Sequence, residues 1–341
     1  MSVRIAVVGA TGAVGTVMVQ CLHERGLWNG DVRLFATARS AGRVIDGVTV
    51  EALDTDADLR GIDIALFSAG GGTSKEWAPQ FVDAGATVID NSSAFRRDPA
   101  VPLVVAEVNP HVLRGIGPAH PQIVANPNCS TMQLMVALAP IHREAGIERV
   151  IVSTYQSVSG TGQRALEELE TQVRADMEGR AMPAPSLYPD HIAFNVIGAA
   201  GSFPDGDDHT DEERKMMFET RKILEDEQIG VAVTCVRVPV RISHAESVNV
   251  QTREPLSVER ARELFAAAPG VILQDVPSPL AAAGHDEVFV GRLRADESHP
   301  RALSMFVVAD NLRKGAATNA VQIAELLIRD GGYRRADPVA S

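Results

Sequence analysis

Apolar residues in the first half of the chain form short runs that alternate with helical patterns. Each run is rich in β-branched residues and has the length of a strand buried on both faces. Helical spacing of apolar residues follows the first run, and it follows the third run through Trp77 and Phe81. This alternation predicts an α/β domain with a doubly wound parallel sheet, whose ligands gather at the strands' carboxyl ends. The predicted strands cover residues 3–8, 32–37, 62–67 and 87–90.

The second half has a different pattern. A helix that is apolar nearly all round is predicted from Met132 to Ile141, followed by strands that are separated by long loops. The loops, at 178–190 and 198–209, are rich in Pro, Gly and Asp. This pattern predicts a second domain with its own sheet. The predicted strands are 149–156, 231–237, 288–294 and 303–308, and the predicted helices are 163–178, 210–223 and 310–328.

Composition is that of an ordinary globular protein, and 341 residues suffice for two domains. No apolar run is long enough to cross a membrane, and the first residues lead directly into a strand instead of a signal peptide. Three widely spaced cysteines form neither a disulfide framework nor a zinc site, so we expect a cytoplasmic protein without a metal. A net charge of -12 argues against nucleic acid as a partner.

The segment Asn126–Thr131 stands immediately before the apolar helix. Pro127 cannot lie inside a helix, and Asn, Ser and Thr commonly close a first helical turn. We therefore expect Cys129 at or beside a helix N-terminus, where the helix dipole favours a thiolate nucleophile. The alternative is a small buried side chain without chemistry, as most cysteines outside disulfides are.

Two glycine-rich turns, at residues 9–15 and 68–74, each lie between a predicted strand and a predicted helix. The first has the spacing G-x-x-G-x-x-G, a variant of the Rossmann fingerprint, in which glycines let the backbone approach a pyrophosphate at the helix N-terminus. The alternative is a glycine-rich turn that binds nothing. The predicted cofactor contacts are Gly9, Thr11, Gly12, Ala13, Val14, Ser68, Ala69 and Gly70.

The second strand ends without the acidic residue that binds the ribose of NAD. Arg39 and Ser40 stand there instead, and a cation with hydroxyls suits a 2′-phosphate, so we expect NADP(H). A solvated loop arginine is the alternative. Arg96 follows the fourth strand in the segment Asn91–Arg96, where a guanidinium fork suits phosphate or carboxylate, although surface arginines are commoner.

Together these segments resemble the aspartate-semialdehyde dehydrogenase family over nearly the full length of the chain. The resemblance is carried in order by residues 9–15, 38–42, 91–96 and 126–131, and by further segments of the second half. It implies a Rossmann-type NADP-binding domain over 1–127, completed by the C-terminal helix 313–332. It also implies an α+β catalytic and dimerisation domain over 128–312 with a mixed, largely antiparallel sheet.

The resemblance also implies a role for individual residues. Cys129 would be the acylated nucleophile, and His244 would be the acid–base group, with an ordinary pKa that suits neutral pH. From its place beside Cys129, and not from the resemblance, we expect the Asn128 amide near the oxyanion. Gln156 would orient the substrate, Arg237 would bind the substrate carboxylate, and Glu212 would bind the substrate amino group. Phosphate would be bound by Arg96 and Lys215, and the nicotinamide would lie near Ser159, Gly160 and Asn311.

The residues themselves leave several of these roles open. Gln156, at the end of an apolar strand, either caps a turn or points into a site. Glu212 and Lys215 share a helix face, where a solvated ion pair is the ordinary interpretation. Arg237 and His244 are seven residues apart, so a regular strand would place them on opposite faces, and they can converge only through a bend near Pro239.

The resemblance predicts NADPH-dependent reductive dephosphorylation of L-aspartyl-4-phosphate to L-aspartate-4-semialdehyde through a Cys129 thioester. This reaction would serve lysine, methionine, threonine and isoleucine biosynthesis in a homodimer. Alternatives are an N-acetyl-gamma-glutamyl-phosphate reductase and a non-catalytic NADPH-binding sensor, which would need no reactive cysteine.

Overall fold

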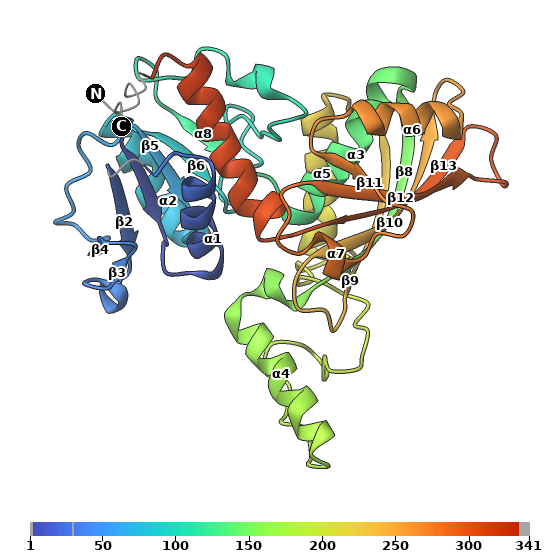
Figure 1. The fold of residues 1–341 in the computed structure, drawn as a ribbon, viewed down its shortest axis with the longest axis horizontal. Coiled ribbons are helices and arrows are strands. Elements are labelled where there is room, and N and C mark those ends of the chain that lie inside the picture. Colours follow the sequence, from blue (N-terminus) through green and yellow to red (C-terminus); the bar gives the residue numbers. More distant parts are fainter. Residues whose placement is uncertain (1–2, 29–30, 334–341) are drawn as a thin grey trace. The chain divides into compact units, whose positions relative to one another are not determined.

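The computed structural model describes residues 3–28 and 31–333, and the chain divides into two compact units. The first unit comprises Met1–Asn128 and Ala316–Ser341, and the second comprises Cys129–Gly315. Figure 1 shows the elements of each unit in sequence colours. No helix in the described ranges has the length and apolar character that a membrane span requires.

The first unit is built on a seven-stranded sheet in the order β3-β4-β2-β1-β5-β6-β7. All neighbouring strands are parallel except β3 and β4. The central strands are fully buried, as their β-branched runs predict. The strands are β1 Ile5–Val8, β2 Val32–Ala36, β3 Val44–Ile45, β4 Val48–Ala52, β5 Ile64–Phe67, β6 Thr87–Asp90 and β7 Ile123–Ala125.

Helices cover both faces of this sheet. One apolar core joins α1 (Ala13–Glu24) and α8 (Thr318–Asp330) to the sheet, and a separate core contains Trp77 and Phe81 of α2 (Gly71–Asp83). Two 3₁₀ turns, η1 (Ala38–Ser40) and η2 (Pro110–Leu113), complete the unit. The predicted doubly wound Rossmann-type sheet is confirmed. Strands β3, β4 and β7 were not predicted: β3 and β7 have only two and three residues, and β4 contains polar residues beside its valines.

The second unit contains a six-stranded mixed sheet in the order β11-β12-β13-β10-β8-β9. Pairing is antiparallel between β12 and β13, β13 and β10, and β10 and β8, and parallel at the two edges. This confirms the predicted mixed sheet. The strands are β8 Ile147–Gln156, β9 Gly230–Arg237, β10 His244–Thr252, β11 Val271–Leu273, β12 Val288–Ala295 and β13 Ala302–Ala309.

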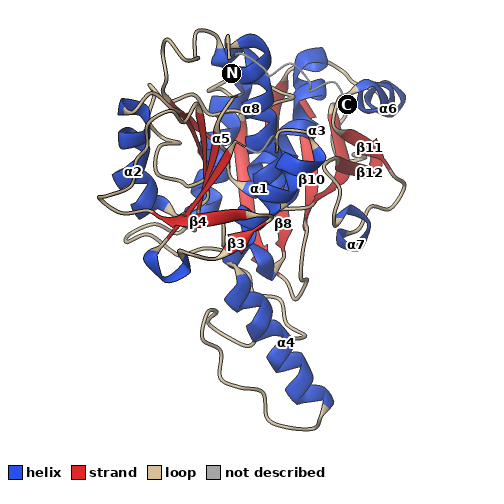
Figure 2. Cartoon of the chain, turned by 60° about the vertical axis from the view of Figure 1, so that its left-hand side comes forward, coloured by secondary structure: helices blue, strands red, loops and turns tan. Residues whose placement is uncertain are grey.

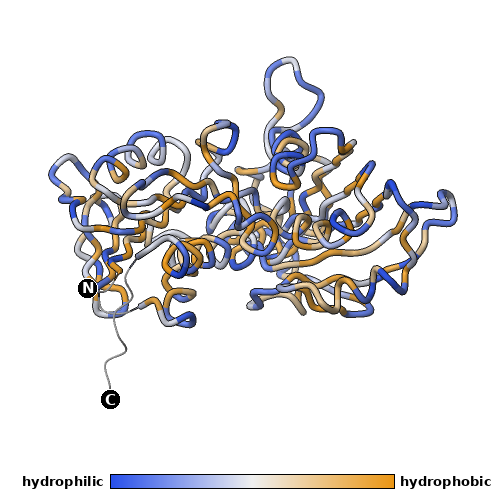
Figure 3. The backbone as a smooth tube through the Cα atoms, turned by 90° about the horizontal axis from the view of Figure 1, so that it is seen from above, coloured by the Kyte–Doolittle hydropathy of each residue, from blue (hydrophilic) through white to orange (hydrophobic). Residues whose placement is uncertain are grey.

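Helix α3 (Cys129–Ala145) packs on β8, β10, β12 and β13, with α5 (Asp211–Leu224) and α6 (Val258–Ala267) beside it. Helix α4 (Gln163–Met177) extends away from the sheet of its unit, as Figure 2 shows. Short turns are η3 (Val158–Thr161), α7 (Pro279–Ala282) and the π-helical η4 (Arg313–Ala317). The predicted last helix therefore begins with a π turn. Figure 3 shows that hydrophobic and hydrophilic stretches of backbone alternate along the chain, with hydrophilic residues prominent in the projecting loops.

Candidate active site

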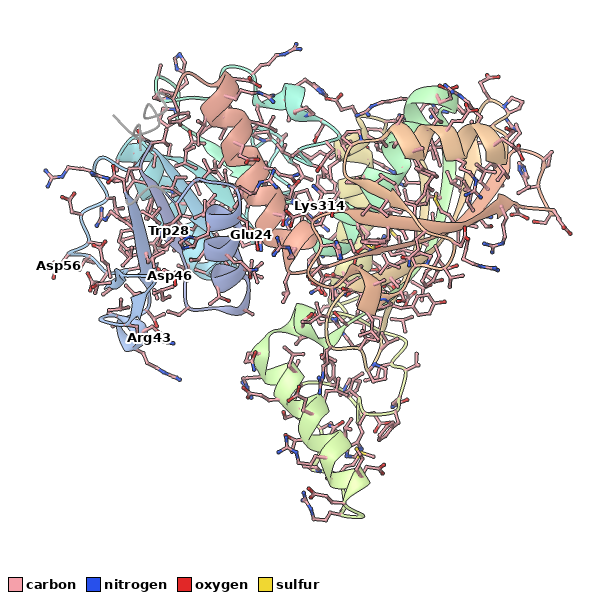
Figure 4. The ribbon with its side chains drawn as sticks, viewed as in Figure 1. Glu24, Trp28, Arg43, Asp46, Asp56 and Lys314 are labelled. Carbon is pink, nitrogen blue, oxygen red and sulfur yellow. The ribbon has the colours of Figure 1, made fainter. Side chains whose placement is uncertain are left out.

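Cys129 is the first residue of α3, which confirms its predicted place at a helix N-terminus. The next residue, Ser130, is fully buried, and its hydroxyl accepts a hydrogen bond from Gln156 Nε2 at 2.9 Å. Gln156 therefore points into the unit beside the start of α3 and does not cap a turn. Gly315, on the π turn, packs so closely that an added Cβ would lie 2.9 Å from Cys129 Cβ. Its neighbour Lys314, labelled in Figure 4, is fully buried.

A row of buried polar side chains lies at one end of the second unit's sheet. Gln156 and Arg237 are paired residues of β8 and β9, and His244 opens the adjacent strand β10. All three are at most 7 % exposed. Arg237 and His244 therefore come from two separate strands, connected through residues 238–243, and not from one continuous strand.

Gly160 shows that Arg237 and His244 converge. A Cβ added at Gly160 would lie 3.2 Å from His244 Nε2 and 3.4 Å from an Arg237 terminal nitrogen. The connection between the strands requires an unusual conformation at Ser243, whose φ is 75°. The bend on which convergence was predicted to depend is present.

The hydrogen bonds of His244 define its tautomer. Nδ1 accepts the backbone N–H of Ser157 at 3.0 Å, and the Ser157 hydroxyl lies 3.1 Å from the same nitrogen. Because a backbone N–H can only donate, Nδ1 carries no proton and the neutral ring holds its proton on Nε2. Nε2 has no hydrogen-bond partner among the described residues and faces Gly160.

Burial and the neighbouring Arg237 guanidinium lower the pKa of His244 to about 3. The expectation of an ordinary pKa near neutrality for His244 is therefore wrong. A fully buried imidazole beside a cation loses the hydration that stabilises its charged form. His244 is neutral at pH 7 and presents an N–H donor at Nε2.

Asn311 joins three segments around this row. Its Oδ1 accepts hydrogen bonds from Ser159 Oγ at 3.0 Å and Ser243 N at 2.9 Å, and it lies 3.2 Å from Ser157 Oγ. The two serine hydroxyls are 3.0 Å apart. Asn311, Ser159 and Gly160, which were predicted to lie together, do so within the second unit. Sequence reasoning missed Ser157, whose side chain carries no signal apart from its place beside Gln156.

Helix α5 begins with a capping box and carries Glu212 and Lys215 on one face. The Thr210 hydroxyl accepts the Glu213 N–H, and the Glu213 carboxylate accepts the Thr210 N–H. The other Glu213 oxygen accepts the backbone N–H of Cys235 on β9 at 3.0 Å, so the start of the helix is tied to the sheet. Lys215 Nζ forms ion pairs with Asp211 at 2.6 Å and Glu212 at 3.2 Å.

The glycine turn of the first unit is packed too tightly for side chains. Gly9 has φ +85°, and an added Cβ would lie 2.6 Å from the Ser68 carbonyl oxygen. A Cβ at Gly15 would lie 2.1 Å from the Gly9 carbonyl oxygen. Gly12 caps α1, and Ala13 and Val14 begin it. With Thr11 half-buried beside them, these residues form the backbone cradle that the fingerprint requires.

The second glycine turn is adjacent to the first. Ser68 N donates to Val8 O at 2.8 Å, Ala69 follows, and Gly70 caps α2 with φ +83°. Arg39 and Ser40 lie in η1, just after β2. Arg39 is exposed and forms no ion pair with another described residue, so its guanidinium is available to an anion.

Arg96 is buried, at 7 % exposed, and donates to the Asn91 carbonyl at 2.9 Å. It is therefore not the surface arginine of the alternative interpretation. Asn126 donates to the Asn91 side chain at 2.7 Å and to the Ala316 carbonyl at 3.0 Å, which ties the segment before the cysteine to the π turn that precedes α8. Asn128 is also buried. The described ranges contain no cluster of side chains suited to a metal ion.

Comparisons with known proteins agree with this arrangement. The semialdehyde dehydrogenase NAD-binding domain family matches residues 4–116, and the semialdehyde dehydrogenase dimerisation domain family matches 138–314. The aspartate-semialdehyde dehydrogenase of Aquifex aeolicus is 52% identical, over 97% of this chain and 99% of that one. That of Streptomyces akiyoshiensis is also 52% identical, over 95% of this chain and 98% of the relative.

Solved structures show the same fold. Aspartate semialdehyde dehydrogenase II of Vibrio cholerae, solved as a complex with ASA, superposes with a TM-score of 0.91 at 45% identity, covering 97% of this chain and 99% of that one. The Candida albicans enzyme, solved with NADP, has a TM-score of 0.72 at 24% identity, covering 95% and 98%, and shows the fold alone. From these full-length matches, the chain belongs to the aspartate-semialdehyde dehydrogenase family.

Proposed function

We propose that this oxidoreductase reduces L-aspartyl-4-phosphate to L-aspartate-4-semialdehyde with NADPH, through a thioester on Cys129. The reaction lies in the aspartate pathway, which supplies lysine, methionine, threonine and isoleucine. The observation that carries the proposal is the position of Cys129 as the first residue of α3, in the unit that also buries Gln156, Arg237 and His244 together.

In the proposed first step, the Cys129 thiolate attacks the acyl carbon and phosphate leaves. The helix N-terminus favours the thiolate, because the amides of the first turn present partial positive charge. Gln156 and Ser130, joined by their hydrogen bond, orient the substrate beside the sulfur. The thioester divides one difficult reduction into two easier steps.

His244 acts in this proposal as a hydrogen-bond donor. Its Nε2 proton faces the site, where it stabilises the negative charge that develops on the substrate carbonyl oxygen. When the thiohemiacetal collapses, the electrons of the C–S bond return to sulfur and regenerate the Cys129 thiolate. The backbone N–H of Cys129 and the Asn128 amide are proposed further donors to the oxyanion.

The residues of the glycine turns fit a dinucleotide. The Gly9–Gly15 contact leaves no room for a side chain, so the N-terminus of α1 packs directly on the turn, where a helix N-terminus favours a pyrophosphate. Arg39 and Ser40 would bind a 2′-phosphate, which favours NADP over NAD. Bound NADPH would supply the hydride that reduces the thioester.

The remaining polar residues are assigned to substrate groups. Arg237 would bind the substrate carboxylate, since its guanidinium is buried and its Tyr188 and Ser157 contacts hold its plane. Glu212 would bind the amino group. Arg96 and Lys215 would each bind phosphate. These roles are supported by burial, by the pairing of charges and by the family.

We also propose a homodimer. The second unit exposes large apolar side chains, including Ile151 and Tyr155 on β8, and Met177 and Phe194 on and beside α4. Exposed apolar surface of this kind marks protein interfaces. The match of this unit to a dimerisation domain supports the same conclusion.

The test is reduction of NADP in the presence of L-aspartate-4-semialdehyde and inorganic phosphate, with N-acetylglutamate semialdehyde and NAD as controls. We expect activity with the aspartate substrate, lost without phosphate and weaker with NAD. Activity with the N-acetylated substrate alone would overturn the substrate assignment. Activity with neither, from folded protein that binds NADPH, would indicate a sensor.

A further inference from the structure

Lys215 is paired with two carboxylates, and only one of them, Glu212, has a role in the proposed function. The second, Asp211, is the closer of the two, with Oδ2 at 2.6 Å from Lys215 Nζ. An ammonium has three donors, so these two contacts leave one for any other acceptor. Asp211 also stands four residues before the lysine, the helical spacing and order that favour such a pair.

Asp211 is held in position and is not a mobile surface carboxylate. Its Oδ1 accepts the backbone N–H of Ser202 at 2.7 Å, while its own N–H donates to the Ser202 carbonyl at 2.8 Å. Gly201, with φ +90°, packs against the same oxygen, and an added Cβ there would lie 2.3 Å from it. The loop before α5 therefore fixes the carboxylate with Oδ2 toward the lysine.

The charge at this position decides what Lys215 can bind. Burial opposes ionisation of the lysine, but Glu212 and Asp211 outweigh it and raise its pKa, so the side chain is an ammonium. A phosphate that approaches this ammonium meets the negative charge of Asp211 and competes with it for the same N–H groups. Phosphate is a substrate in one direction and a product in the other, so tight binding would slow its release.

We propose that Asp211 is a positioning residue that weakens phosphate binding by competing for Lys215. This inference rests on the proposed phosphate role of Lys215. It predicts that removal of the Asp211 charge makes phosphate bind more tightly, a gain that damage to the fold cannot produce.

The test compares wild type with Asp211→Asn, which keeps an acceptor for Ser202. In phosphate-dependent semialdehyde oxidation, the KM for phosphate should fall about two- to fivefold, the range of a partly exposed ion pair. The KM for the semialdehyde should not fall with it. Calorimetric titration of each protein with inorganic phosphate should show the same tightening without turnover.

Asp207→Asn is the matched control. It removes one negative charge just before the same helix, where Asp207 holds Arg214 at 2.6 Å, and it should leave the phosphate KM unchanged. In a Lys215→Ala background, Asp211→Asn should give a smaller gain, because the shared partner is absent. An unchanged or raised KM for phosphate in Asp211→Asn overturns the inference, whereas absence of phosphate-dependent activity in the wild type overturns the proposed function instead.

Discussion

The glycine turn of the first unit and the polar row of the second unit both lie at the ends of strands, but one is built from backbone groups and the other from side chains. The turn uses backbone alone: the Gly12 N–H donates to the Gly9 carbonyl, and Gly15 packs against the same carbonyl. The polar row uses side chains from distant segments, and these side chains are buried with their charges and donors. An atom added to the glycine turn collides with backbone. A changed chemical group in the polar row instead leaves a buried partner without its hydrogen bond.

The largest effect on activity should come from a substitution in the second unit, which contains Cys129. Cys129→Ala removes the proposed nucleophile, and we expect turnover to fall by at least about 10³-fold, as at other covalent catalytic sites. NADPH affinity, measured by fluorescence titration, should be unchanged. Cys235→Ala is the control, since that thiol is buried and its pKa is raised by burial and nearby carboxylates, and it should retain activity. Loss of NADPH binding in Cys129→Ala would instead show a structural cysteine.

The glycine turn should show the reverse behaviour. Gly15→Ala places a Cβ 2.1 Å from the Gly9 carbonyl, so the turn must open. We expect NADPH to bind on the order of 10–100-fold more weakly, from backbone strain of about 1–3 kcal/mol. The rate of Cys129 alkylation by iodoacetamide should stay near that of wild type. If the rate of Cys129 alkylation fell as much as NADPH affinity, the glycine turn and the polar row would not be structurally independent.

This difference explains what the sequence could predict. The turn, the strands beside it and the start of α3 at Cys129 depend on neighbouring residues, so local patterns were sufficient. The meeting of Arg237 with His244 depends on two strands that flank β8, and the Asn311 contacts depend on strand order. No local pattern encodes these, and the pKa of His244 follows from a burial that only the packed structure contains.

At Gly160 a glycine of the backbone lies directly against the side chains of the polar row, and its missing side chain leaves space for them. Gly160→Ala would bring a Cβ within 3.2 Å of His244 Nε2 and 3.4 Å of Arg237. We expect the KM for the semialdehyde to rise and kcat to fall, each by about tenfold or less, from strain of about 1 kcal/mol. Gly198→Ala, in a loop of the same unit with open space around it, should leave both unchanged.

The smallest predicted effect is on the free energy of unfolding, and it arises from the buried side chain of Glu246 in the second unit. Glu246 lies two residues after His244 on β10 and is fully buried, and neither oxygen has a hydrogen bond of good geometry to a described residue. Burial raises the pKa of Glu246 well above its ordinary value, although the nearby Gln133 amide opposes the rise. The folded state therefore favours the protonated acid.

The sign of the pH dependence follows from this shift. Protonated Glu246 contributes its full stability below the unfolded-state pKa of about 4.5, and that contribution is lost as the pH rises toward the folded-state pKa. Glu246→Gln mimics the protonated form at every pH. The variant should exceed wild type in free energy of unfolding at pH 8, by about 1 kcal/mol, and the difference should shrink toward pH 5. Urea denaturation at both pH values measures it, with Glu227→Gln, on the surface, as control. A variant that is less stable than wild type at pH 8 would show that the buried Glu246 carboxylate is ionised and stabilised by its neighbours, so that its burial carries no such cost.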